Sequence, residues 1–235
     1  MTVRWLLLDA SALPDTDDWL GQDEKKNLSG LRFPKRRAEW KLGRYTAKCA
    51  LSSYAGVERL AQIEIIAAED GAPEAFVDGR NMDCAISISH RADVAACVVA
   101  EHGAVGCDLE AIEPRTTRFV NDFFTEHERI EVERTSDELR DLRVALTWSA
   151  KESALKALRV GLRRDTRSVE VLIGNSLSGG PGWSLLETNV RPEGRSLRGW
   201  WRQADGLALT VVSADESEVE ESSLNPRRLA NSEPR

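Results

Sequence analysis

Stretches of apolar residues alternate with polar ones through the first hundred residues, and their spacing predicts short strands around one long helix. Apolar runs of strand length occur at 3–8, 63–67, 84–89 and 94–100. From Pro34 to Ala55 the apolar residues instead recur at helical spacing among charged ones, which predicts a helix. The run at 3–8 is too short for the apolar core of a signal peptide, so we expect a buried strand there.

The second hundred residues follow a similar outline. A strand over 104–110 is expected to form a hairpin with 94–100, because the intervening Glu101-His102-Gly103 favours a turn. Helical spacing then predicts helices over 118–134 and 137–159. Further strands are predicted at 168–173, 183–187, 197–203 and 207–213, the last two joined by a turn at Asp205-Gly206.

A strand, helices and then strands, found twice, indicate an α+β protein of two similar half-domains. We place the N-terminal half at 1–102 and the C-terminal half at 103–213, although no repeat of individual residues proves a duplication. Residues 214–235 are acidic and then rich in serine, asparagine, proline and arginine, with little apolar surface to bury. We therefore predict a disordered tail there.

Three acidic residues point to a cation site. Alternation along the strand at 104–110 places Asp108 and Glu110 on the same face. Glu152 lies one turn after Trp148, on the side of an amphipathic helix that should face the core. Carboxylates that converge in a half-buried place repel one another and resist ionisation unless a cation neutralises them. Because hard cations take oxygen ligands, we predict that all three residues hold Mg²⁺.

The bulk composition excludes several classes of protein. The formal net charge of −7 argues against attraction to nucleic acid or to an anionic membrane. No segment approaches the ~20 apolar residues that span a bilayer. The four cysteines are dispersed without a Cys-x-x-Cys pair, so we expect free thiols rather than disulfides or zinc. These features are typical of a soluble, cytoplasmic enzyme, which we expect to be a monomer.

One segment is strongly basic within this acidic chain. Against the single acid Glu39, residues 32–48 carry Arg32, Lys35, Arg36, Arg37, Lys41, Arg44 and Lys48. Such a cluster favours an anion with several phosphates, and Arg37 and Arg44 share a helix face because they lie seven residues apart. The alternative is a solvated helix face with ordinary ion pairs, such as Glu39 with Arg36. Both interpretations stay open.

His90 is a second candidate for phosphate binding. It ends the strand-like segment Ser87–His90, where its imidazole can donate a hydrogen bond to a phosphate. The alternative is a histidine that caps the strand or forms a hydrogen bond to a polar group of the core.

The sequence contains no glycine-rich phosphate loop, no Gly-x-Ser-x-Gly elbow and no Cys–His nucleophile pattern. Phosphoryl chemistry without such a loop needs a metal held by carboxylates, together with cations for the remaining charge.

Four motifs of this chain resemble those of the 4′-phosphopantetheinyl transferases, in the class that activates surfactin and enterobactin synthetases. They also follow one another along the chain in the order typical of that family. Gly106–Glu110 is similar to the Gly-x-Asp-x-Glu strand of that family, and Trp148–Lys156 to its Trp/Phe-Ser-x-Lys-Glu-Ser/Ala-x-x-Lys helix. Ser87–His90 resembles its Ser-x-Ser-His segment, and Arg36–Arg44 its Arg-x-x-Glu-x-x-x-Gly-Arg helix. The resemblance extends over about 36–162.

The resemblance implies a pseudo-twofold arrangement of two α+β halves with the active site in the cleft between them. It implies transfer of the 4′-phosphopantetheine group of coenzyme A to a serine of an apo acyl or peptidyl carrier protein, with release of 3′,5′-ADP. Mg²⁺, for which Mn²⁺ can substitute, would be held by Asp108, Glu110 and Glu152. Either Glu152 or a water on the metal would take the serine proton.

The resemblance also implies two sets of contacts with coenzyme A. The nucleotide side would consist of Arg37, Arg44, Ser89 and His90. The phosphate side would consist of Lys151, Lys156 and, through the metal, Asp108, and Lys156 is also expected to take part in catalysis.

One residue departs from the family pattern. Many members place Lys or Arg before a proline ahead of the Ser-His strand, where this chain has Ala72 before Pro73. Either Arg80 substitutes for it, or one phosphate contact is missing and coenzyme A binds more weakly.

The alternative function is a non-catalytic relative that binds coenzyme A or carrier proteins, but such a protein would not need all three acids and both motif lysines. Which carrier proteins are served is not legible from the sequence.

Overall fold

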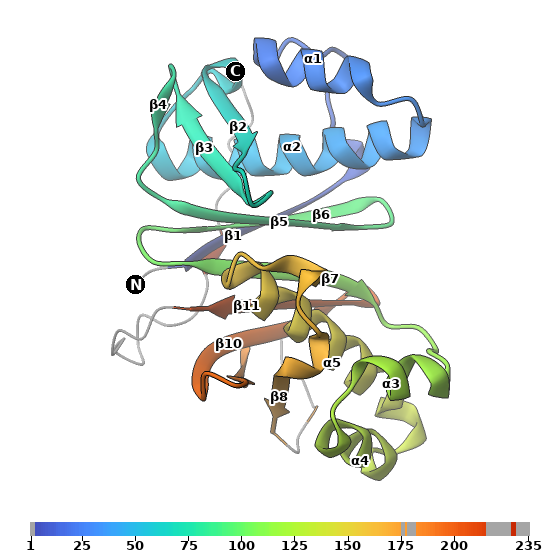
Figure 1. Cartoon of the computed structure of the whole chain (residues 1–235). Coiled ribbons are helices and arrows are strands. Elements are labelled where there is room, and N and C mark those ends of the chain that lie inside the picture. The colour runs from blue at the N-terminus through green and yellow to red at the C-terminus, as the bar shows by residue number, and fades with distance from the viewer. Residues whose placement is uncertain (1–2, 175–176, 178–181, 215–226, 229–235) are drawn as a thin grey trace. The chain divides into compact units, whose positions relative to one another are not determined.

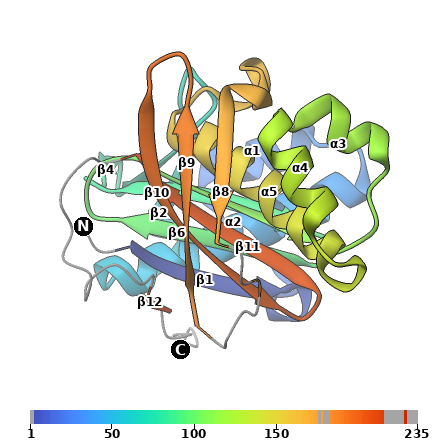
Figure 2. The same cartoon turned by 90° about the horizontal axis from the view of Figure 1, so that it is seen from below.

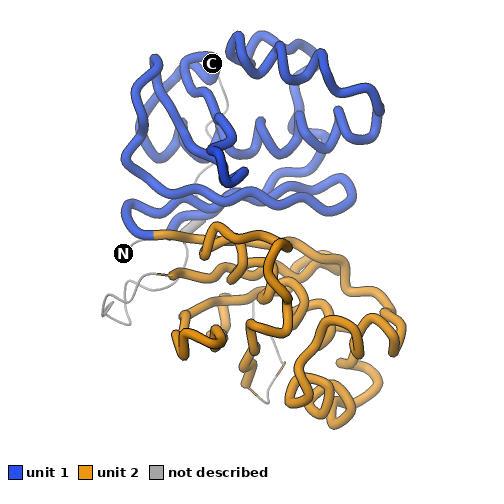
Figure 3. The backbone as a smooth tube through the Cα atoms, viewed as in Figure 1, with its two compact units in different colours: residues 1–103, 219–235 blue, residues 104–218 orange. Residues whose placement is uncertain are grey.

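The chain folds into two compact units, each described here from the residues that the computed structural model describes, 3–174, 177, 182–214 and 227–228. Unit 1 contains residues 1–103 together with 219–235, and unit 2 contains residues 104–218 (Figure 3). Each unit combines helices with a largely antiparallel sheet, so the α+β class is confirmed. Most of the predicted tail, 214–235, lies outside the described residues.

In unit 1 a long helix packs on a sheet built from the first and last strands of the unit. The sheet order is β12-β1-β6-β5, where β1 (Val3–Asp9) and β5 (Ala85–Arg91) both run antiparallel to β6 (Val94–Ala100). The short β12 (Arg227–Arg228) pairs in parallel with β1. Helix α2 (Pro34–Ala55) packs against β6 and β1 (Figure 1). Its bounds are those predicted from the sequence.

The sequence itself sets both ends of α2. Pro34 opens the helix, where its fixed backbone angle and missing N–H group cost nothing. Gly56 closes it in the left-handed conformation with a φ of 69°, which a residue without a side chain adopts readily.

A second, three-stranded sheet in unit 1 was only partly predicted. Strand β2 (Ile63–Ala67) was expected, but β3 (Pro73–Val77) between β2 and β4 (Arg80–Asn81) was not. Asp78 and Gly79 connect β3 to β4 in a tight turn with positive φ angles of 48° and 75°.

Helix α1 (Gln22–Gly30) was missed altogether. It is short and mostly polar, and only Glu24 and Leu28 are buried, so it shows almost no apolar periodicity. Two short 3-10 helices, Ala10–Ala12 and Leu60–Gln62, complete the unit.

Unit 2 has a five-stranded antiparallel sheet covered by one long helix. The sheet order is β7-β11-β10-β9-β8. Its strands are β7 (Val105–Ala111), β8 (Val169–Ile173), β9 (Ser184–Val190), β10 (Arg195–Ala204) and β11 (Leu207–Ser213). Helix α5 (Asp137–Ala157) packs mainly against β7 and β11, and Leu146, Ala150, Trp201 and Val212 contribute to the core beneath it.

Two short helices lie beside α5 in unit 2 (Figure 2). The continuous helical segment predicted at 118–134 is in fact α3 (Thr117–Phe123) followed by α4 (Glu126–Arg134). Thr125 divides them because its side chain accepts a hydrogen bond from the Glu128 amide and so caps α4. Two 3-10 helices, Gly161–Arg163 and Thr166–Ser168, lead from α5 to β8.

The predicted hairpin between 94–100 and 104–110 is wrong. Strand β6 already has β1 and β5 as its two neighbours, and β7 pairs with β11 instead. A turn signal next to two apolar strands therefore marks a boundary between compact units here, because local sequence cannot show which strand fills each edge.

The two units share one plan. Unit 2 and the 1–103 segment of unit 1 each begin with a strand, continue with short helical segments and a long helix, and end with strands of which the last pairs antiparallel with the first. In both units the long helix packs against this first-and-last pair, which is β1 with β6 in unit 1 and β7 with β11 in unit 2.

Gly106 permits an unusually close approach of α5 to β7. A Cβ atom at this position would lie 1.9 Å from the carbonyl oxygen of Ser153 and 2.6 Å from the amide nitrogen of Ala157. Both are backbone atoms of the helix, so no side-chain rotation could relieve the clash. The hydroxyls of Ser153 and Ser149 lie 2.7 Å and 2.8 Å from that of Thr210 on β11, which satisfies small polar groups at the same contact.

We predict that Gly106→Ala lowers the free energy of unfolding by about 3 kcal/mol, because helix and strand must move apart to admit the methyl group. Urea unfolding followed by circular dichroism measures the change. Gly174→Ala is the matched control, since among the described residues no atom lies within 4 Å of a Cβ built at Gly174. Equal stability of the two variants would contradict this account of the helix–strand contact.

Candidate active site

Asp108 and Lys156 form the centre of an ionic cluster where α5 crosses β7. Asp108 is only 3% exposed, and its Oδ1 lies 2.7 Å from Nζ of Lys156. The same Nζ donates a hydrogen bond of 3.0 Å to the carbonyl oxygen of Cys107. Burial alone would lower the pKa of Lys156, but the charges of Asp108 and Glu152 outweigh it and raise the pKa above its ordinary value. Lys156 is therefore a fixed positive charge.

Glu152 lies next to this pair, one helical turn before Lys156. Its Oε2 is 3.9 Å from Nζ of Lys156. Burial, followed by the negative charge of Asp108, raises the pKa of Glu152 to about 7, although Lys156 opposes the change. A carboxyl group with this pKa exchanges its proton near neutral pH and is suited to general acid–base chemistry.

Glu110, two residues after Asp108, is held by side chains that the sequence did not single out as site residues. The indole Nε1 of Trp148 donates to its Oε1 at 3.1 Å, and Nη2 of Arg115 donates to its Oε2 at 3.1 Å. The Trp148 ring packs on Phe119 with centroids 5.1 Å apart. The position of Trp148 inside the long-helix motif was the one available signal for its role.

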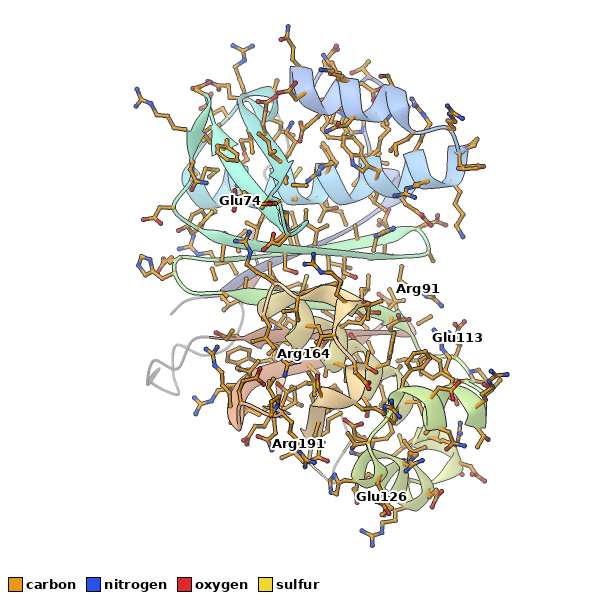
Figure 4. All side chains as sticks on the ribbon, viewed as in Figure 1. Glu74, Arg91, Glu113, Glu126, Arg164 and Arg191 are labelled. Carbon is orange, nitrogen blue, oxygen red and sulfur yellow. The ribbon has the colours of Figure 1, made fainter. Side chains whose placement is uncertain are left out.

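Arg115 links two acids on the segment between β7 and α3. Besides Glu110, it contacts Oε1 of Glu113 at 3.2 Å, and Figure 4 labels Glu113 on this segment. Its guanidinium carbon also lies 5.4 Å from the centroid of the Phe119 ring. Arg115 thus neutralises part of the acidic charge of the candidate site.

Among the described residues, no three His, Cys, Asp or Glu side chains are gathered closely enough to hold a metal ion in this geometry. Lys156 contacts Asp108 and Glu152, while Trp148 and Arg115 bind Glu110. The chemistry of the donor set nevertheless fits a hard cation, because three carboxylates share one region and Glu152 resists ionisation there.

Lys151, predicted to contact phosphate, has a different place in the structure. Its side chain is fully buried, and Nζ lies 2.8 Å from Oε2 of Glu128 and also donates to the carbonyl oxygens of Thr166 and Val169. All three donors of the ammonium group are therefore used inside unit 2. This contradicts the prediction that Lys151 binds coenzyme A, because a side chain with no exposed surface cannot reach a ligand.

In unit 1, α2 and β5 bring part of the predicted nucleotide side together. Nε2 of His90 lies 3.6 Å from Oε2 of Glu39, and the His90 side chain is 44% exposed. Ser89 is buried beside it in β5. Helix α2 lies close to the same strand at Gly43, where a Cβ would lie 3.4 Å from Cγ2 of Ile88.

Arg44 is the most suggestive member of the basic segment. It lies 5.2 Å from the Trp40 ring, and its buried Nε has no hydrogen-bond partner among the described residues. Burial lowers its pKa, and Glu24 opposes this only in part. An incompletely paired, partly buried guanidinium suits an anionic ligand.

The other basic residues of α2 mostly have structural partners. Arg37 donates to the carbonyl oxygens of Leu28 and Leu31 at the end of α1. Lys41 pairs with Asp17 at 2.6 Å, Lys35 with Glu39 at 3.8 Å, and Lys48 with Glu24. The interpretation as ordinary ion pairs is thus correct for much of this segment, although Glu39 pairs with Lys35 rather than Arg36.

Two predictions from composition are also tested. All four cysteines are free thiols, with Cys97 and Cys107 buried and Cys49 and Cys84 half-buried. Across the described part of the chain, we find no helix with the length and apolar character required to cross a membrane.

The family profile and the related sequences that match this chain carry the same family name. The sequence profile of the 4′-phosphopantetheinyl transferase superfamily matches residues 104–212. The 4′-phosphopantetheinyl transferase HetI of a Nostoc species is 27% identical over 183 residues, 75% of this chain and 76% of the relative. The 4′-phosphopantetheinyl transferase AcpT of Salmonella typhimurium is 32% identical over 148 residues, 61% of this chain and 69% of the relative.

Among solved structures, a holo-[acyl-carrier-protein] synthase of Thermotoga maritima is 23% identical to this chain. The match covers 53% of this chain and 74% of that structure, with a TM-score of 0.34.

We predict that Glu152→Gln stabilises the metal-free protein above pH 7. The pKa of Glu152 is about 7 in the folded state, against the ordinary value of 4.5. Between pH 4.5 and pH 7 the folded protein therefore binds more protons than the unfolded chain, so its free energy of unfolding falls as the pH rises. The variant should therefore gain about 1–3 kcal/mol at pH 8 and little at pH 4. Urea unfolding with a chelator present measures this, with the exposed Glu133→Gln as control. A gain in stability that does not depend on pH would contradict the raised pKa of Glu152.

Proposed function

The chain belongs to the 4′-phosphopantetheinyl transferases, and we propose that it transfers the 4′-phosphopantetheine group of coenzyme A to a serine of an apo acyl or peptidyl carrier protein. The observation that carries this proposal is the cluster of Asp108, Glu152 and Lys156, which combines a carboxyl group of pKa about 7 with a fixed cation. Such a set can move a proton and stabilise phosphate charge in one place.

Asp108, Glu110 and Glu152 are the residues proposed to hold Mg²⁺. When bound, the metal would neutralise and orient the pyrophosphate of coenzyme A. Lys156 pairs with Asp108 and Arg115 pairs with Glu110, so both cations lie beside the proposed ligands. Mn²⁺ has the same preference for oxygen ligands and is expected to substitute.

The proposed reaction is an in-line displacement at phosphorus. The serine Oγ of the carrier forms a bond to the β-phosphorus of coenzyme A while the bond from this phosphorus to the bridging oxygen breaks. The electron pair of the broken bond leaves with 3′,5′-ADP. The serine proton passes to the carboxylate of Glu152 or to a water molecule at the site. Lys156 adds positive charge next to the proton acceptor.

Unit 1 is proposed to hold the nucleotide. Arg44, with its unsatisfied Nε, and His90, partly exposed beside Ser89, supply donors for phosphate oxygens. Arg37 retains donors besides the one that closes α1 and can extend this set. Arg80 is exposed on β4. It is the candidate to replace the Lys or Arg that many family members have at the position of Ala72.

The arrangement of the two units as pseudo-twofold halves, with the active site between them, is also a proposal. Their shared order of strand, helices and strands supports it, as does the division of candidate residues between nucleotide-side residues in unit 1 and catalytic residues in unit 2. A monomeric, cytoplasmic enzyme and boundaries near residues 102 and 213 belong to the same proposal.

Incubation with coenzyme A, Mg²⁺ and a panel of apo carrier proteins tests the activity. We expect a mass gain of one phosphopantetheine group on a carrier serine, together with release of 3′,5′-ADP. Asp108→Asn and Glu152→Gln should each lower the rate by about 10²–10⁴-fold, because each removes charge that acts at the reacting phosphorus.

Glu126→Gln is the matched control, since Glu126 is exposed on α4 and points away from the rest of unit 2 in Figure 4. Binding of coenzyme A without an adduct on any carrier would favour a non-catalytic relative.

We further predict that His90→Ala raises the KM for coenzyme A by about tenfold with little change in kcat, because a lost phosphate contact costs about 1.4 kcal/mol of binding. We assign His90 to the 3′-phosphate of the nucleotide, so the same variant should use 3′-dephospho-coenzyme A, which lacks that phosphate, as well as the wild type does. His127→Ala, on α4 of unit 2, serves as control. An equal loss with both substrates would show that His90 acts elsewhere.

A further inference from the structure

A buried ion pair fixes the middle of α5 in unit 2. Glu128, the third residue of α4, accepts a hydrogen bond of 2.7 Å from the amide of Thr125 and pairs with Nζ of Lys151 at 2.8 Å through the same oxygen. Its other oxygen accepts from the amide of Val171, the third residue of β8, at 2.7 Å. One carboxylate therefore ties together α4, α5 and β8, three elements that lie side by side in Figure 2.

Unit 1 contains the same construction. Glu24, the third residue of α1, accepts from the amide of Gly21 at 3.1 Å and pairs with the buried Lys48 of α2. Its other oxygen accepts from the amide of Ile65, the third residue of β2, at 3.3 Å. We call these the unit 1 anchor (Glu24–Lys48) and the unit 2 anchor (Glu128–Lys151).

The agreement between the anchors extends to the surroundings of each lysine. Lys48 lies 5.7 Å from the Trp19 ring centroid, and Lys151 lies 5.9 Å from that of Phe124. Each aromatic residue comes just before the short helix of its unit. Both lysines also donate to backbone carbonyl oxygens, and burial lowers the pKa of both against the opposing charge of their glutamates.

What differs is the residue that follows each lysine. Lys151 is followed by Glu152, whereas Lys48 is followed by Cys49, a half-buried thiol. Neighbouring residues on a helix point about 100° apart, so fixing the lysine on one side fixes the direction of the next side chain.

We propose that Glu128 is a positioning residue that acts through Lys151 to hold Glu152 toward Asp108. Because a buried ion pair is often no more stabilising than apolar residues of the same size, stability alone does not account for this one. The unit 2 anchor instead sets the rotation of α5 about its axis, and Gly106 sets the distance of the helix from β7. The two contacts together place Glu152 beside Asp108 and Lys156. This proposal rests on the proposed function, which supplies the reaction for its kinetic readout and the Mg²⁺ site for its second readout.

The experiment compares two double variants that remove each anchor without leaving an unpaired charge. Glu128→Leu with Lys151→Met removes the unit 2 anchor, and Glu24→Leu with Lys48→Met removes the unit 1 anchor as the matched control. We expect similar changes in thermal stability, because the two constructions are alike. The unit 2 variant should lose about 30- to 100-fold in kcat, as small errors in position do. The unit 1 variant should keep kcat within about twofold of the wild type.

A second readout does not depend on turnover. Saturating Mg²⁺ without coenzyme A should raise the melting temperature of the wild type and the unit 1 variant, and raise that of the unit 2 variant less, because Glu152 is no longer held in place. If the unit 2 double variant does not fold, Glu128→Asp decides, since it keeps both charges but shortens the reach of the carboxylate. It should fold, with kcat lowered by about tenfold.

Equal losses of kcat in both double variants, or full kcat in a folded unit 2 variant or in Glu128→Asp, would overturn the proposal. Failure of the wild-type enzyme to modify any carrier would instead overturn the proposed function. The Mg²⁺ shift in melting temperature would then still test the positioning of Glu152.

Discussion

The contact between α5 and β7 at Gly106 is the constraint on which the candidate active site depends. Two backbone atoms of the helix occupy the space that any side chain at this position would need. The catalytic candidates of strand and helix can be neighbours only because the elements approach this closely, and the distance of 2.7 Å between Asp108 and Lys156 follows from it. The serines of the long-helix motif belong to the same constraint, since Ser149 and Ser153 share Thr210 as a partner. Both serines of the motif thus serve the packing of the helix on the strand.

Neighbouring side chains balance most of the acidic charge at this contact. Lys156 neutralises Asp108, and Arg115 with Trp148 holds Glu110, but Glu152 is left with a pKa of about 7. A group that resists ionisation in the folded protein lowers stability once it is charged. The site therefore gives up stability at neutral pH for a carboxyl group that can exchange a proton and accept a cation there. Such conflicts between stability and chemistry are expected at functional sites.

Apolar spacing was sufficient to predict the long elements, and polar spacing was sufficient to predict the candidate acids. Helix α2 has the predicted bounds because Pro34 and Gly56 mark its ends, and β11 because a mostly apolar run follows the turn at Asp205-Gly206. Strand pairing could not be predicted, since the choice between β6 and β11 as partner of β7 is made by long-range packing. Lys151 was misread for a similar reason. Its motif position suggested a phosphate ligand, but Glu128, twenty-three residues earlier, draws it into the core.

The repeated anchor separates what the two units share from what distinguishes them. Both units fix a long helix on a sheet with a buried glutamate that binds a lysine, a helix cap and a strand amide. A feature found in both units cannot by itself account for chemistry proposed for only one of them. The difference lies in the neighbours of the anchor, where unit 2 has Glu152 after the lysine and an acidic strand beside it, while unit 1 has Cys49. The superfamily profile matches residues 104–212, which lie within unit 2.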